Sequence, residues 1–163
     1  MTSDDRGTEG WCLLGLQRPA EAAAAFKEAQ AGGSSRSASD SALGETLSHL
    51  RDGETDAAVD SASRTSLSAE KRRTLGVQII SQKAYDAYRD GRWQETIDFL
   101  RQRAAYAPET RDLLMLRGWA LYHLGDYDGA RRVFMTADQQ ISDAASRQAL
   151  ATVSTAADPR AYR

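Results

Sequence analysis

The sequence is poor in the residues that build disulfide-linked or catalytic proteins. It has one cysteine, Cys12, only two histidines, and no asparagine. A single cysteine excludes an internal disulfide framework, and we expect Cys12 to be a small apolar core residue. His49 and His123 stand near no nucleophile at a recognisable spacing, so structural roles are expected for both. The sequence therefore predicts that the protein is not an enzyme, with no cofactor and no metal.

Long apolar runs and an excess of one charge are also missing. Residues 1–10 are polar and acidic, and no run of about 18 apolar residues follows. We therefore expect no signal peptide, no membrane insertion, and a cytoplasmic location as the chain stands. The net charge is −2, and the one short basic run, residues 71–73, is expected to be a solvated helix face. No nucleic-acid partner is predicted.

Alanine and leucine dominate the apolar residues, and β-branched runs are almost absent. This composition favours helix throughout the chain. The three prolines, Pro19, Pro108 and Pro159, stand where helices are expected to begin or end. The sequence thus predicts an all-α protein, long enough to bury a core as one domain or one short array.

A repeat organises the second half of the chain. Residues 91–96 (GRWQET) recur as residues 125–130 (GDYDGA), 34 residues later (125 − 91), and each copy lies between two amphipathic segments. Residues 10–29 align in the same way with residues 118–137. Gly125 suits the left-handed conformation that ends a helix, and Asp126 can cap the helix that follows. A fixed period of this length is typical of stacked helix pairs.

These residues resemble the tetratricopeptide repeat. Residues 111–144 fit best, with small, glycine and aromatic residues on the family pattern: Gly118, Leu121, Gly125, Tyr127, Ala130, Phe134 and Ala137. Arg117 departs from the pattern, and in residues 77–110 so do Thr96 and Arg103, which we expect to weaken the packing there. The resemblance implies a short right-handed solenoid of antiparallel helix pairs with a C-terminal capping helix.

The repeat pattern divides the chain into five segments. Residues 1–36 are a first helix pair that starts as though cut inside a repeat, and residues 37–66 are a degenerate second repeat. Residues 67–110 form a third repeat whose first helix is extended, residues 111–144 form the fourth, and residues 145–163 form the capping helix and a tail.

Several local expectations accompany these boundaries. Residues 31–41, rich in glycine and serine, are expected to be a flexible connection. Leucines 43, 47 and 50 lie at helical spacing and indicate a helix of the degenerate second repeat. Ser68 is expected to cap a long helix over residues 69–90, and the last helix is expected over residues 144–157, stopped by Asp158 and Pro159.

The start of the first pair predicts an uncovered edge. Arg6 and Glu9 stand where leading apolar residues are expected, which leaves Trp11, Leu13 and Leu14 on that edge. A longer array, a partner or self-association through this N-terminal edge could cover it. If the chain is a piece of a larger exported protein, its location would be periplasmic.

The resemblance also implies where a ligand would bind. In this family the groove is lined by the first helix of each pair, and the matching positions here are largely aromatic. The implied ligand- or partner-binding residues are Trp11, Tyr85, Tyr88, Arg89, Trp119, Tyr122 and His123. For Tyr88 and Tyr122 a packing role is an equal alternative. Aromatic rings with polar tips suit either an extended peptide or a sugar chain.

Two functions remain open at the level of sequence. The first is a protein-interaction scaffold that binds a peptide or helix of a bacterial partner in the aromatic groove. The alternative is a module of a bacterial exopolysaccharide synthesis or export apparatus, because residues 68–93 look like the repeats of cellulose-export proteins. A chaperone-type carboxylate clamp is excluded, because that clamp uses asparagines and the chain has none.

Overall fold

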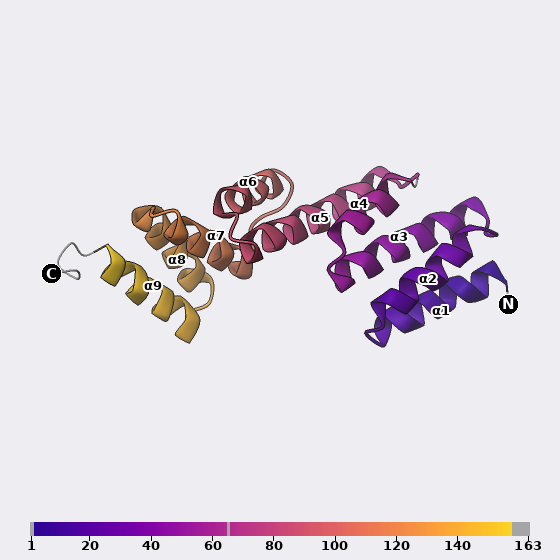
Figure 1. Ribbon diagram of the computed structural model, residues 1–163, viewed down its shortest axis with the longest axis horizontal. Helices are drawn as coiled ribbons and strands as arrows, with labels where there is room; N and C mark the ends of the chain where they lie inside the picture. Colours follow the sequence, from indigo (N-terminus) through magenta and orange to yellow (C-terminus); the bar gives the residue numbers. More distant parts are fainter. Residues whose placement is uncertain (1, 65, 158–163) are drawn as a thin grey trace. The chain divides into compact units, whose positions relative to one another are not determined.

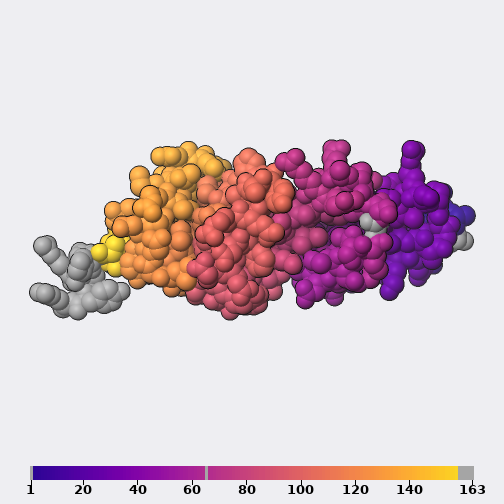
Figure 2. Space-filling view, turned by 90° about the horizontal axis from the view of Figure 1, so that it is seen from above, coloured from indigo at the N-terminus to yellow at the C-terminus, as the bar shows by residue number. Residues whose placement is uncertain are grey.

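The structure, a computed structural model, describes residues 2–64 and 66–157 as nine α-helices without a strand (Figure 1). The predicted all-α class is therefore confirmed. The chain divides into two compact units, an N-terminal unit (Met1–Gln82) and a C-terminal unit (Lys83–Arg163). Within each unit, side chains fill the spaces that the ribbon leaves open (Figure 2). No described helix combines the length and apolar character needed to cross a membrane.

The N-terminal unit contains α1 (Ser3–Gly15), α2 (Pro19–Gln30), α3 (Ser35–Asp52), α4 (Thr55–Ser63) and the first part of α5 (Ala69–Arg89). Helices α1 to α4 pack each on the next, and α1 also touches α3. A capping box of Thr2 and Asp5 starts α1, and Pro19 starts α2 as predicted. The unit thus builds helix hairpins in which neighbouring first helices meet.

Phe26 is the centre of the N-terminal core. Its side chain is fully buried and packs with Leu14 and Ala22. Gly10 of α1 and Gly44 of α3 contact the same ring, because a Cβ placed on them would lie only 2.7 Å and 2.4 Å from its atoms. Three helices can therefore converge on one aromatic ring only where two of them carry glycine.

Two expectations for α1 are wrong. Cys12 is exposed rather than buried, because Gly10 and Leu14 turn toward the core and a residue midway between them lies about 200° round the helix. Leu14 is buried and not on an open edge, with 5% of its surface exposed. Trp11 keeps 43% of its surface exposed. Cys12 therefore lies on the side of α1 that faces away from Phe26, whereas the half-exposed Trp11 ring packs edge-to-face against Phe26.

The expected flexible connection is also shorter than predicted. Helix α3 already begins at Ser35, and the Ser34 side chain caps it by accepting a hydrogen bond from the Ser37 backbone N–H at 3.3 Å. The buried side of α3 is small and polar, whereas Leu43, Leu47 and Leu50 are only half-buried. Leu47 packs against the cluster of Leu14, Ala22 and Phe26, and the Phe26 ring fills the remaining space against α3.

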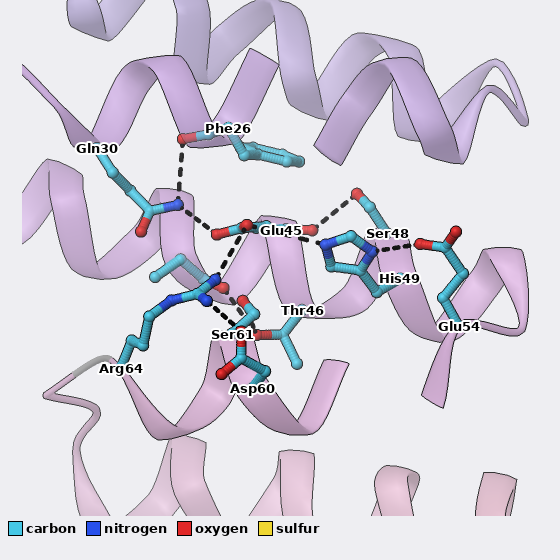
Figure 3. Close-up of polar contacts among 12 residues, drawn as sticks. Phe26, Gln30, Glu45, Thr46, Ser48, His49, Glu54, Asp60, Ser61 and Arg64 are labelled. Atoms are coloured by element: carbon cyan, nitrogen blue, oxygen red, sulfur yellow. Dashed lines mark hydrogen bonds and ion pairs between the residues drawn. The ribbon is translucent and has the colours of Figure 1, made fainter. Parts of the chain in front are cut away.

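A polar network holds α2, α3 and α4 together (Figure 3). Glu45 is 4% exposed, and its carboxylate accepts a hydrogen bond from Gln30 Nε2 at 2.7 Å. His49 Nε2 and Arg64 approach the same carboxylate at 3.8 Å and 3.6 Å. A buried carboxylate needs such partners, since its desolvation is costly. Polar contacts thus join α3 to α2 and α4 in addition to the apolar contact of Leu47 with the core.

The C-terminal unit contains the end of α5, then α6 (Trp93–Ala104), α7 (Arg111–His123), α8 (Tyr127–Gln140) and α9 (Ala144–Ala156). Helices α6 to α9 pack each on the next, and α7 also touches α9. Fully buried Phe134 packs with Ala130, Ala149 and Val153. The predicted stop at residues 158–159 lies outside the described residues.

Helix ends fall close to the predicted positions. The Ser68 side chain accepts a hydrogen bond from the Lys71 backbone N–H at 3.3 Å, which confirms the cap of α5. Asp126 caps α8 in the same way through Gly129 at 2.9 Å. Gly91 and Gly125 have φ of 74° and 80°, as predicted for the turn that ends a helix.

The first pair makes its turn without glycine. Gln17 aligns with Gly125 (17 + 108 = 125), and it adopts φ 60°. The left-handed conformation costs a non-glycine residue about 1 kcal/mol or more. The same left-handed turn therefore follows α1 and α7, although only the turn after α7 has a glycine at this position.

The polar departures from the repeat pattern have hydrogen-bond partners. Arg117 donates twice to Glu109, at 3.0 Å and 2.7 Å. Buried Thr96 donates to the Arg92 carbonyl at 3.1 Å, and Arg103 donates to the Pro108 carbonyl at 2.8 Å. Satisfied groups do not carry the penalty of buried unpaired ones. This removes the physical reason for expecting weak packing in residues 77–110.

The stability of the N-terminal end of α9 is expected to depend on pH. The backbone N–H of Ser146 donates to Asp143 at 2.9 Å and lowers the pKa of this carboxyl below its ordinary value of 3.8, with a smaller contribution from Arg111. A carboxyl whose pKa is lowered by folding stabilises the folded state at every pH above its ordinary pKa. This stabilisation is lost as the pH falls through the lowered pKa of the folded state. We expect the amides of α9 to lose hydrogen-exchange protection over that acidic range.

Replacement of Asp143 by asparagine provides the control. Asparagine also caps helices but does not titrate, so Asp143→Asn should show a smaller loss of α9 protection on acidification. Asp138 continues to titrate in both proteins, since its own pKa is lowered mainly by the Ser146 hydroxyl. An identical acid response in wild type and variant would contradict the assignment to Asp143.

Candidate functional site

Helix ends in the C-terminal unit bring aromatic side chains together. Trp93 is the first residue of α6 and follows the left-handed turn at Gly91. This turn returns the chain toward α5, where Tyr88 lies in the last turn, and the two ring centroids are 5.1 Å apart. A reversal between two helices thus places a tryptophan against a tyrosine.

His123, the last residue of α7, joins this pair. Its ring stacks on Trp93 with centroids 4.1 Å apart and planes 12° from parallel. Tyr88 and Tyr122 approach His123 at 6.4 Å and 5.6 Å. We call the side chains in this set the aromatic cluster: Tyr88, Trp93, Trp119, Tyr122, His123 and Tyr127.

The remaining members connect the stack to the core. Trp119 lies 5.6 Å from Tyr122 and 5.0 Å from buried Phe134, both in edge-to-face geometry. Tyr127 lies 5.5 Å from Tyr122. Aromatic pairs at these separations contribute about 0.5–1.5 kcal/mol each beyond their area burial. The cluster is therefore a continuous, mutually supported set of rings.

The cluster is anchored on one side and accessible on the other. His123 is exposed, while Tyr88, Trp93, Trp119 and Tyr122 are half-buried. Half-buried rings keep fixed rotamers because their neighbours hold them, yet they still offer surface to a ligand. The cluster is therefore suited to binding a ligand through packing against its aromatic rings.

Burial affects the tyrosine phenols in this region. It raises the pKa of Tyr88, and it raises the pKa of Tyr85 together with the nearby charge of Asp112. Both phenols therefore stay protonated at neutral pH and can donate a hydrogen bond. Arg89 is largely exposed and pairs with Asp86 at 3.0 Å, which leaves it at the edge of α5 as a solvated cation.

The structure brings only part of the predicted site together. Tyr88, Trp119, Tyr122 and His123 make ring contacts with one another. Tyr85, 39% exposed, and Arg89 lie on the same helix end as Tyr88, but no ring contact within the described residues joins Tyr85 to the cluster. Trp11 belongs to the N-terminal unit, where it lines a pocket between α1 and α3.

Sequence reasoning missed Trp93 and Tyr127 as site residues. Both stand at the start of a second helix, where the repeat pattern assigns aromatic residues to packing. The available signal was the glycine turn before Trp93, because such a turn returns the next residues toward the end of the preceding helix.

The chain was also compared with known proteins. A scan against protein-family models and a search of curated proteins find no match for it. The resemblance to the tetratricopeptide repeat therefore rests on the residue pattern of the chain itself.

Proposed function

We propose that this chain is a non-catalytic scaffold, a right-handed solenoid of tetratricopeptide-like helix pairs that binds a peptide or helix of a partner protein at the aromatic cluster. The observation that carries the proposal is the Trp93–His123 stack, flanked by Tyr88 and Tyr122. The recurring left-handed turns, and the contacts of α1 with α3 and of α7 with α9, support the solenoid.

The physical character of the cluster favours a peptide. Large aromatic side chains lose little conformational entropy on binding, and they are enriched at the energetic centres of protein interfaces. The rings of Trp93 and Tyr88 have apolar faces, while the tyrosine hydroxyl can hydrogen-bond to a peptide group. The exposed cation of Arg89 fits a polar rim around such a centre.

A peptide selection tests this function. A phage library of random peptides about 12 residues long is selected on the full chain, and selected peptides are measured by isothermal titration calorimetry. We expect dissociation constants of about 1–100 µM, typical of short peptides in surface grooves. Trp93→Ala and His123→Ala should each weaken binding by about tenfold or more, because each removes half of the stack.

Tyr106→Ala is the matched control, since Tyr106 is a 51% exposed tyrosine of the same unit that follows α6 and is not a member of the cluster. It should leave the dissociation constant unchanged. Equal affinity of the selected peptides for wild type and Trp93→Ala would refute the cluster as the site. If the selection yields no binding peptide, and cello-oligosaccharides bind saturably in a way that Trp93→Ala abolishes, the result would instead favour the exopolysaccharide alternative.

A further inference from the structure

A second candidate site lies in the N-terminal unit, between α1 and the first half of α3. The pocket has a volume of about 360 Å³, within the usual range of small-molecule sites. All its lining residues belong to this unit, so it is separate from the aromatic cluster and independent of the function proposed for that cluster.

A serine hydroxyl at the pocket makes no hydrogen bond to another described residue. Ser41 is 3% exposed and lines the pocket, yet among the described residues nothing hydrogen-bonds to its side chain. Gly7 faces it across the helix contact, where a Cβ would lie 3.4 Å from Ser41 Oγ. Because the Ser41 hydroxyl is not sealed inside the protein, it can exchange a hydrogen bond with a molecule that enters the pocket.

Trp11 provides an aromatic wall. Its ring packs edge-to-face against buried Phe26, with centroids 4.9 Å apart and planes 72° apart. The contact holds the indole in place, while 43% of the residue stays exposed beside the pocket. A held and exposed indole is a suitable surface for stacking a ring-shaped ligand.

The charges around the pocket balance. Asp40 Oδ1 pairs with Lys71 Nζ at 2.5 Å, and Asp4 Oδ1 accepts a hydrogen bond from the Ser37 hydroxyl at 2.9 Å. Arg36 lines the pocket, is exposed, and has no ion pair within the described part of the chain. Because two carboxylates are matched by two cations, neither an anion nor a cation gains a strong advantage here.

We propose that this pocket binds a neutral saccharide. A pyranose ring would stack on the Trp11 indole, and its hydroxyls would donate to the second oxygens of Asp4 and Asp40. The Arg36 guanidinium would donate to a sugar oxygen, and the Ser41 hydroxyl would gain the partner that it lacks. A mixed set of donors and acceptors beside one aromatic face matches a polyhydroxylated ring better than it matches an ion or an apolar molecule.

Titration of the full ¹⁵N-labelled chain tests the proposal. The probes are the methyl glycosides of glucose, galactose, mannose and N-acetylglucosamine, together with cellobiose, lysine amide and inorganic phosphate. We expect at least one sugar to shift the backbone amides of α1 and of residues 35–41 saturably, with a millimolar dissociation constant. Lysine amide and phosphate should bind there more weakly.

Three variants separate binding from folding. Arg36→Gln should weaken sugar binding at least threefold without affecting the fold, since Arg36 is exposed and makes no ion pair within the described part of the chain. Trp11→Ala should weaken it at least fivefold. Arg131→Gln, an exposed arginine of α8, is the matched control and should change nothing.

Three results at the pocket itself would overturn the saccharide site. They are the absence of saturable shifts at α1 and residues 35–41 with every sugar, tighter binding of a charged probe there, or an Arg36→Gln variant with wild-type affinity. Sugar-induced shifts around Trp93 and His123 alone would also overturn it, and would place saccharide binding at the aromatic cluster.

Discussion

Replacement of Phe134 by alanine is expected to lower the free energy of unfolding by about 3–5 kcal/mol, the usual cost of removing a large buried aromatic side chain. The ring is fully buried and lies 5.0 Å from the ring of Trp119. It also fills the space over Gly118, where a Cβ would come within 2.3 Å of it. Truncation would leave a cavity between α7, α8 and α9, and urea unfolding followed by circular dichroism measures the loss.

The neighbouring residue supplies the control. Met135 is 48% exposed, so Met135→Ala should change the free energy of unfolding by no more than about 0.5 kcal/mol. Helical arrays can unfold in parts, so the near-ultraviolet dichroism, to which Trp119 contributes beside Trp11 and Trp93, should also fall if packing around Phe134 is lost. Similar effects of the two substitutions would show that Phe134 does not hold these helices together.

The importance of Phe134 could be read from the repeat. Phe26 and Phe134 occupy matching positions, and each packs on a glycine at the matching position of the preceding helix, Gly10 and Gly118. Such contacts are local, because each joins two helices that follow one another in the chain. The same locality explains why the caps at Ser68 and Asp126 were predicted correctly.

The interior of the N-terminal unit could not be predicted in this way. The leucine spacing indicates which side of α3 is apolar, but burial depends on the space between α2 and α3. At the closest contact this space is filled by the Phe26 ring, which leaves room only for Gly44. The buried carboxylate of Glu45 likewise depends on Gln30, which lies fifteen positions away and has no sequence signal linking the two (45 − 30). Both features belong to tertiary packing, which overrides local pattern.

The candidate site shows the same limit. Tyr88, Tyr122 and His123 could be selected because they lie on first helices, where the family pattern places ligand contacts. Trp93 could not, because its stack with His123 depends on the distance between the start of α6 and the end of α7. A position in the repeat indicates only the role that residues usually have there. The role of a particular residue, such as Trp93, depends on the contacts that it makes.

Replacement of Gly44 by alanine is expected to lower the free energy of unfolding by about 1–3 kcal/mol, the cost of overpacking a filled core. This sign is opposite to the usual one, because alanine normally stabilises a helix interior relative to glycine by about 0.5–1 kcal/mol. The new Cβ would lie 2.4–2.6 Å from three atoms of the Phe26 ring. Gly10 is in close contact with the same ring, which limits how far the ring can shift.

Gly76→Ala is the matched control, because Gly76 lies inside α5 with no atom within 4 Å of its would-be Cβ. It should stabilise the protein by about 0.5–1 kcal/mol, so urea unfolding should move the two variants in opposite directions. Adding Phe26→Leu to Gly44→Ala should cost less than the sum of the single changes, since the smaller side chain relieves the clash. If both glycine substitutions stabilise, the Phe26 ring has room to shift, and close contact with glycine is not what brings α1, α2 and α3 together.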